Sequence, residues 1–396
     1  MKKGIVILLV LCIFLTGCWN RRELNELAIT LAIGIDKSDD EYLVSAQVVV
    51  PSEVSLAGGK VGSPVTLVQA RGETVYEAFR KMTKSSPRKI YPGHLRMLVL
   101  GESLAEEGIG DPLDLISRDW EFRSDFFVVI ARDSTAEEIL NIQTPIETIP
   151  ANKLFNTLKI SEENWSATAG VRIDELVVDL RSDGKEAVLT GILAIGNKEI
   201  GSSKENLETI MPYAELQYDD IAVFKKDKLV GWLTENESRG YNGIRNEVKS
   251  TVATISCPKE GKANLEVLRF KTKLKGKVKN GSPEVDINMH IDANVGEIEC
   301  PIDISKPESI KALEKIYEKE VEETVRQSIT SVQKKFETDI FGFGDAIHRS
   351  NPKEWKKLKH QWDEHFTNMK ANIKVDVKIL RTGTVNNSIT EKEKDN

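Results

Sequence analysis

The first half of the chain alternates short apolar runs with amphipathic segments. β-Branched runs at residues 27–36 and 41–50 flank four polar residues, a pattern typical of an antiparallel hairpin. Further strands are predicted at residues 65–69, 95–100, 126–131 and 186–195, and the one at 95–100 is expected to be buried. Helices are predicted at residues 74–84, 103–107, 113–120, 135–141, 150–159 and 172–180. This alternation predicts an α/β region with a mixed sheet.

The second half has a different pattern and begins with a polar stretch at residues 196–215, which we interpret as a linker or loop. Two apolar runs at residues 221–224 and 229–233 then predict a second hairpin. Residues 284–298 alternate apolar and polar positions in places, which predicts a long strand. Further long strands are expected at residues 252–256, 263–278 and 373–380.

A long helix is predicted at residues 307–339. From Ile310 to Phe336, one stripe of positions recurs at steps of three or four, with Glu and Lys on the other side. Such a stripe usually marks a helix that lies on a sheet. A coiled-coil seam facing a partner is the alternative, although the stripe contains Thr324 and Ser328.

Together these elements predict a multidomain α+β fold, with three domains expected, in which mixed or antiparallel sheets pack against helices. We divide the chain into a leader, an N-terminal α/β region, the linker or loop, a C-terminal domain of β-sheet and long helix, and a disordered tail, at residues 1–17, 18–195, 196–215, 216–383 and 384–396. The N-terminal region could itself contain two domains that share strands with residues 215–235, and the sequence leaves this open.

The first eighteen residues predict export and lipid attachment. Lys2 and Lys3 precede an apolar run of 12 residues that ends at Leu15. As a helix this run spans roughly 18 Å, too short for the ~30 Å hydrocarbon core, so it fits a secretory signal. The box Leu15-Thr16-Gly17-Cys18 is similar to bacterial lipoprotein cleavage sites, in which the cysteine thiol accepts a diacylglyceryl group. We therefore predict lipid attachment at Cys18; an ordinary signal peptide is the alternative.

Besides Cys18, the mature chain contains two cysteines, Cys257 and Cys300, and each precedes a proline at an expected strand end. A compartment outside the cytoplasm permits a disulfide between them. Such a bridge would be worth roughly 4 kcal/mol in the chain-entropy model. Two separate buried thiols are the alternative.

Composition limits the class of protein. The chain of 396 residues is 40% hydrophobic and 30% charged, which is too polar for a polytopic membrane protein. Its net charge is −7, or −9 once Lys2 and Lys3 leave with the signal. An acidic chain without long basic runs is a poor nucleic-acid binder, because phosphate neutralisation needs clustered Lys and Arg.

No catalytic or cofactor template matches the sequence. Neither G-x-S-x-G nor G-x-G-x-x-G occurs, and the glycines at 191 and 196 lack the following Lys and Ser/Thr of a phosphate loop. His360 and His365 are five positions apart, about 140° around a helix, so with His348 they do not converge on a metal. We therefore expect no metal, no cofactor and no enzymatic activity.

Several motifs resemble those of a known family. They are Cys18-Trp19-Asn20-Arg21-Arg22-Glu23-Leu24, Tyr91-Pro92-Gly93-His94, Gly231-Trp232-Leu233, Asp339-Ile340-Phe341-Gly342-Phe343-Gly344-Asp345, and the later residues Trp355, Trp362 and Phe366. In this order they resemble the Ger(x)C spore germination lipoproteins. The last three have a plain structural interpretation, as one face of a helix that packs onto the sheet.

The resemblance implies a non-enzymatic C subunit of a nutrient germinant receptor, with a three-domain α+β fold. Its place would be the outer face of the inner spore membrane, and its partners a membrane-embedded A subunit and a polytopic B subunit. The B subunit is usually assigned the nutrient site, so direct binding of a small molecule to this chain stays open. Two alternatives differ in class: a solute-binding lipoprotein of an importer, with two similar lobes around a cleft, and a surface hydrolase.

Overall fold

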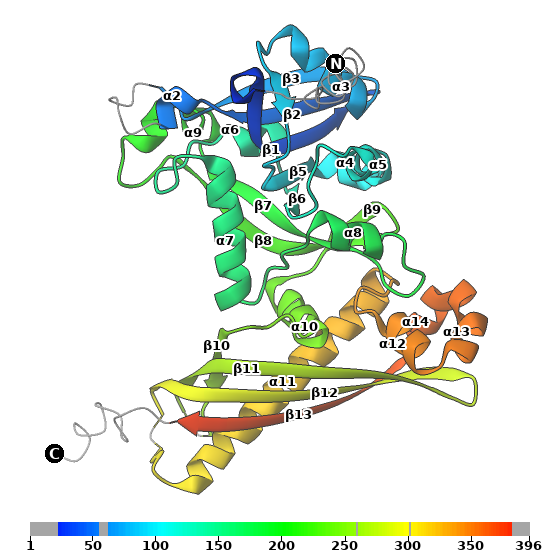
Figure 1. The fold of residues 1–396 in the computed structure, drawn as a ribbon. Helices are drawn as coiled ribbons and strands as arrows, with labels where there is room; N and C mark the ends of the chain where they lie inside the picture. The colour runs from blue at the N-terminus through cyan, green and yellow to red at the C-terminus, as the bar shows by residue number, and fades with distance from the viewer. Residues whose placement is uncertain (1–22, 55–61, 259, 301, 382–396) are drawn as a thin grey trace, which may run out of the picture.

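The structure, a computed structural model, describes residues 23–54, 62–258, 260–300 and 302–381 (Figure 1). The described residues form a sheet of nine strands and a sheet of four strands. In Figure 1 the larger sheet occupies the upper part of the molecule and the smaller one the lower part. Helices pack against both sheets, so the predicted multidomain α+β fold class is confirmed.

The larger sheet has the order β3-β2-β1-β5-β6-β7-β8-β9, with β4 beside β1. The strands are β1 (Leu27–Ser38), β2 (Glu41–Val49), β3 (Val65–Gly72), β4 (Lys89–Tyr91), β5 (Met97–Gly101), β6 (Phe127–Ala131), β7 (Val188–Gly196), β8 (Ala214–Lys225) and β9 (Lys228–Trp232). β1, β5, β6 and β7 are mutually parallel, whereas β2, β3, β8 and β9 join antiparallel. The predicted hairpin of β1 and β2 and the mixed sheet are both present.

Both faces of this sheet are covered, because apolar side chains alternate between two cores along the strands. Leu98 and Leu100 of β5 enter one core, and Met97 and Val99 enter the other. The first core also takes side chains from α3 (Val75–Lys81), α4 (Glu102–Glu107), α5 (Gly110–Arg118) and α8 (Ile173–Asp179). The second takes them from α6 (Ala136–Asn141) and α7 (Pro150–Asn164). Burial on both faces explains the nearly continuous apolar runs of these strands.

Residues 196–215 connect two neighbouring strands of this one sheet. They contain α9 (Lys198–Gly201) and η3 (Lys204–Leu207), and the strands on either side, β7 and β8, pair antiparallel. The buried Asn206 holds the connection in place, since its amide group donates to the carbonyl of Gln143 and its side-chain oxygen accepts from Ala214 N. The stretch is therefore a loop with short helices that connects two neighbouring strands of one sheet, and not a linker between two domains. β8 and β9 belong to the larger sheet.

The smaller sheet has the order β10-β11-β12-β13. Its strands are β10 (Thr251–Ser256), β11 (Lys262–Lys279), β12 (Ser282–Ile298) and β13 (Lys370–Arg381). β12 has the predicted alternation, with every second side chain buried, and β13 returns parallel to it. The tail at residues 384–396, like the leader at 1–17, lies outside the described residues.

The long helix α11 (Pro307–Lys335) lies along the smaller sheet, as Figure 1 shows. Leu313 and Tyr317 pack on the sheet, so this stripe covers a sheet within the chain, as the first interpretation had it. The helix also supplies carboxylates to both edge strands. Glu314 accepts from Ile379 N on β13 at 2.9 Å, and Glu320 accepts from Ser256 N on β10 at 3.3 Å. Carboxylates placed this way occupy edge donors that could otherwise pair with another chain.

The remaining helices are α2 (Pro51–Val54), α10 (Glu235–Arg245), α12 (Phe343–Ser350), α13 (Pro352–Leu358) and α14 (Trp362–Asn368), with the short 3₁₀ turns η1 (Leu24–Glu26), η2 (Met82–Lys84) and η4 (Lys359–Gln361). The expectation of one helix carrying Trp355, Trp362 and Phe366 is wrong. Trp355 lies on α13 and the other two on α14, because η4 breaks the helix between them.

Candidate functional site at the junction of the two sheets

A single apolar core joins the two sheets. The larger sheet contributes Val188, Ile221 and Val223, and the smaller sheet contributes residues of β12. Five aromatic rings from the C-terminal helices and the turn before α12 complete this core: Phe341, Phe343, Trp355, Trp362 and Phe366. The rings of Phe341 and Phe343 stack with centroids 5.1 Å apart, and those of Trp355 and Trp362 meet edge to face at 5.1 Å. Because this core is continuous, the two halves are held as one packed unit.

The backbones of the two halves touch at Gly184 and Gly344. A Cβ atom on Gly344 would lie 2.7 Å from Gly184 Cα, and one on Gly184 would lie 2.8 Å from Asp345 N. Side chains cannot occupy such distances, so only glycine permits this approach. A hydrogen bond from Asp345 N to the Gly184 carbonyl, 3.3 Å long, closes the contact.

Asp339 is the most buried acidic group of the junction, with 1% of its surface exposed. Its carboxylate accepts hydrogen bonds from the backbone of Phe341, Gly342 and Gly344 at 2.8–3.0 Å, just before and within the first turn of α12. Trp362 Nε1 donates a fourth, at 3.0 Å. Burial raises the pKa of Asp339 to about 6, and the four N–H donors hold it from rising further.

Glu186 ties the larger sheet to this acidic loop. Its backbone N–H donates to the Asp339 carbonyl at 2.8 Å, and its carboxylate accepts from Lys226 N at 2.7 Å. Burial raises the pKa of Glu186 to about 7. Lys225, the last residue of β8, forms an ion pair with Asp363 of α14 at 3.0 Å.

A cavity of about 560 Å³ opens beside the junction, with walls from both halves of the chain. Phe127 and Phe155 lie on the side of the larger sheet, and Tyr241 and Arg245 come from α10. The lining carries five acidic and five basic residues: Glu162, Asp174, Glu175, Asp179, Glu247, Lys159, Arg172, Lys185, Arg245 and Lys249. Lys185 pairs with Asp179 and Lys249 with Glu162, at 2.5 and 2.8 Å. Two of the five cations of the lining are therefore neutralised by acidic residues of the same lining.

The described residues offer no metal centre. Within those ranges, no group of three or more His, Cys, Asp or Glu side chains could hold a metal ion. His348, one of the histidines singled out in the sequence, instead stacks on Trp355 with ring centroids 5.9 Å apart. Nor does any helix in the described part of the chain have the length and apolar character of a membrane span.

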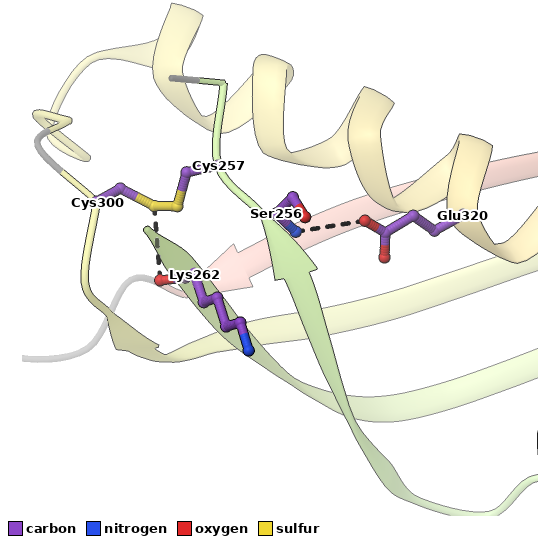
Figure 2. The surroundings of a disulfide bond; sticks show 5 residues. All are labelled: Ser256, Cys257, Lys262, Cys300 and Glu320. Carbon is purple, nitrogen blue, oxygen red and sulfur yellow. Dashed lines mark hydrogen bonds between the residues drawn. A yellow bond between two sulfur atoms is a disulfide. The ribbon is translucent and has the colours of Figure 1, made fainter. Parts of the chain in front are cut away.

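The predicted lipid-attachment residue, Cys18, lies outside the described residues, which begin at Glu23. Cys257 and Cys300 are paired as a disulfide, with Cα atoms 6.0 Å apart (Figure 2). Cys257 follows β10 and Cys300 follows β12, so the bond joins the ends of the two strands that flank β11. Cys300 Sγ also lies 3.6 Å from the Lys262 carbonyl oxygen on β11. Both cysteines belong to the core between the smaller sheet and α11 and not to the core of the junction.

The sequence signalled only part of the junction. The motif from Asp339 to Asp345 could be singled out in the sequence. The structure explains it, because the Asp339 carboxylate accepts hydrogen bonds from the backbone N–H groups of the tight turn that leads into α12. Glu186, Lys225 and Gly184 carry no local signal, because their roles depend on residues more than a hundred positions away.

Comparison with known proteins places the chain in a family. A model for the spore germination protein N-terminal domain matches residues 20–194. A model described as spore germination B3/GerAC like, C-terminal, matches residues 219–383. The chain belongs to the Ger(x)C family. Within the Ger(x)C family, spore germination protein KC of Bacillus subtilis is 35% identical, over 98% of each chain. Spore germination protein B3 of the same organism is 27% identical over 96% of each.

The fold of this Ger(x)C chain is also found in a solved structure. The crystal structure of the GerBC protein matches with a TM-score of 0.57 and 21% identity, covering 88% of this chain and 96% of that one. The boundary between the two family models does not coincide with the boundary between the two sheets. Residues 219–232 belong to the C-terminal family model but lie in the larger sheet. The junction thus brings together residues that the two models divide.

Proposed function

We propose that this protein is the lipid-anchored, non-enzymatic C subunit of a spore nutrient germinant receptor. The observation that carries the proposal is similarity along the whole chain to proteins named as spore germination proteins. Lipid at Cys18 holds the folded part at the outer face of the inner spore membrane. There it acts through protein contacts with the A and B subunits of the receptor.

The fold supports a role in contacts rather than in chemistry. Its two halves share one core, so a partner that docks on either half meets a rigid surface. The tether confines this surface to the membrane face and raises its effective concentration for membrane-bound partners. The two halves have different topologies, a nine-stranded mixed sheet and a four-stranded sheet with a long helix, unlike the similar lobes expected of a solute-binding lipoprotein.

The test is Cys18→Ala in a spore-forming host that depends on this receptor. We expect the protein to leave the spore membrane fraction and the nutrient response to fall, while nutrient-independent germination is unchanged. Cys12→Ala is the matched control, because Cys12 leaves with the signal and its loss should change nothing.

A second variant separates tethering from processing. A single membrane-spanning helix fused ahead of the Cys18→Ala chain should restore the nutrient response. An unchanged response in spores whose protein has left the membrane fraction would contradict the tethered mechanism. A response that stays absent after the helix is added would show that tethering alone does not account for the role of Cys18.

A further inference from the structure

The described chain begins close to its proposed anchor. Glu23 lies five positions after Cys18, and a fully extended chain spans at most ~3.6 Å per residue, about 18 Å in all. The turn η1 (Leu24–Glu26) follows directly, and Leu24 is 69% exposed. If Cys18 carries lipid, as the proposed function holds, Glu23 must lie within this distance of the membrane surface, and η1 follows it directly.

A basic segment lies beside η1. Residues 80–89 contain Arg80, Lys81, Lys84, Arg88 and Lys89 and no acidic residue, in a chain whose net charge is −7. The segment is held next to the start of the chain because β4 pairs parallel with β1, with Lys89 opposite Leu27. The most basic stretch of this part of the molecule is thus placed beside the tether.

Of the five cations in residues 80–89, two form ion pairs and two others are exposed without one in the part of the chain that the structure describes. Lys81 pairs with Glu77, and Lys89 pairs with Glu121. Lys84 and Arg88 are exposed, and the ion pairs found among the described residues include neither. Their charges are available to a partner.

An open groove of about 1060 Å³ is lined by both segments. Leu24 and Asn25 line it from η1, Pro87 and Arg88 from the basic segment, and residues 48–52 from the end of β2 and the start of α2. The carboxylates of Glu23 and Glu26 also lie at this end, but Arg21 and Arg22 precede them in the sequence, so residues 21–26 are neutral overall. We call η1, residues 80–89 and this groove the anchor-side face.

We propose that the anchor-side face docks on the anionic phospholipid surface of the membrane that holds the anchor. Lys84 and Arg88 meet lipid phosphates, and Leu24 enters the interface between headgroups and acyl chains. Two observations favour this occupant over a protein: the short reach from Cys18, and a positive segment on an acidic chain. A lipid chain alone leaves a protein free to rotate about its tether, whereas a charged face fixes which side points to the membrane.

The first experiment uses the lipidated full chain in vesicles of phosphatidylglycerol and phosphatidylcholine. A photo-crosslinking amino acid replaces Leu24, and in a matched control it replaces Leu268, which is exposed on β11 of the smaller sheet. We expect lipid adducts at position 24 and at least tenfold fewer at position 268. Equal yields on chains that remain bound to the vesicles would overturn the docking while leaving the anchor intact.

The second experiment removes the anchor, so that it tests the face by itself. The mature chain with Cys18→Ser is partitioned onto phosphatidylglycerol vesicles at low salt. Each basic residue near an anionic surface strengthens binding about fivefold, so the pair Lys84→Ala/Arg88→Ala should weaken it about 25-fold. The control pair Lys271→Ala/Lys273→Ala makes the same change in net charge on the exposed face of β11 and should have little effect.

Equal losses for the two pairs would mean that net charge alone acts, and would refute a specific face. The photo-crosslinking experiment, repeated in spores, tests the alternative that a protein covers this face. Adducts between position 24 and another receptor subunit, with none to lipid, would overturn the proposal in favour of a protein interface. Release of the lipidated protein from vesicles would instead show that the anchor fails.

Discussion

Two glycines on one helix are expected to respond to alanine with opposite signs. α10 packs against both α11 and β11. Gly240 faces α11, and Gly243 faces the Phe270 ring of β11. Within a helix, alanine is favoured over glycine by about 1 kcal/mol when nothing else changes. The surroundings of each new methyl group therefore decide the sign.

At Gly240 the methyl group has no room. It would lie 2.6 Å from Ser328 Cβ and 3.1 Å from the Thr324 carbonyl oxygen, whereas carbon atoms in contact prefer ~3.5–4.0 Å. The two helices must separate, and overpacking of this kind costs about 1–3 kcal/mol. Separation also weakens the 2.9 Å hydrogen bond from Ser328 Oγ to the Glu237 carbonyl, which is worth about 1 kcal/mol. With the helix gain subtracted, Gly240→Ala should lower the free energy of unfolding by about 1–3 kcal/mol.

At Gly243 the methyl group fits. Its nearest neighbours would be Phe270 Cζ at 3.4 Å and Cε1 at 3.7 Å, followed by Met289 Cε at 4.0 Å. These are ordinary apolar contacts, so the helix preference remains. Gly243→Ala should raise the free energy of unfolding by about 0.5–1 kcal/mol.

The assay is urea denaturation of the mature chain followed by circular dichroism, with the slope against urea checked for constancy. Ser328→Gly removes the clashing carbon, so the double variant Gly240→Ala/Ser328→Gly should show a coupling free energy of about 1–3 kcal/mol. If both alanines shift stability in the same direction, or if no coupling appears, the close approach of α10 and α11 is not what sets the role of Gly240.

Two further predictions concern the disulfide and the junction. Replacing Cys257 and Cys300 by Ala should lower the free energy of unfolding by roughly 4 kcal/mol, since the bond closes a span of 43 residues; identical urea midpoints for the variant and the oxidised parent would contradict this. Burial raises the pKa of Glu186 to about 7 in the folded state, so the stability linked to its protonation is present below its ordinary pKa of 4.5 and lost as pH rises through 7. Glu186→Gln should therefore stabilise the chain by about 1–2 kcal/mol at pH 8 and by much less at pH 5, measured by denaturation at both pH values; a variant less stable than the parent at pH 8 would show that ionised Glu186 is favoured.

Local patterns were sufficient for most helices and strands. The hairpin of β1 and β2, the strands β5 and β6 and the alternating β12 lie where periodicity predicted them. These segments have one or two faces buried against a large core. Because buried positions must be apolar, the spacing of apolar residues in the sequence follows the period of the helix or strand. The pattern failed after Trp355, where α13 and α14 share one apolar cluster although the chain turns at η4 between them.

The place of β8 and β9 could not be read in this way. Their apolar runs predicted a hairpin, but an apolar run does not say which strand lies beside it. Pairing of β8 with β7 across residues 196–215 was decided by the tertiary fold. The same is true of the junction, where Glu186 meets Asp339 across more than 150 residues.

The sequence by itself was enough to predict the leader and its cysteine, the order of helices and strands, and the family resemblance. Each of these depends on a few neighbouring residues or on the spacing of apolar positions along the chain. The tertiary structure alone decided which halves share a core, which glycines touch, which carboxylates are buried, and which cations stand beside the start of the folded chain. These properties depend on pairs of residues far apart in the chain, and their energies arise only when folding has removed the water between them.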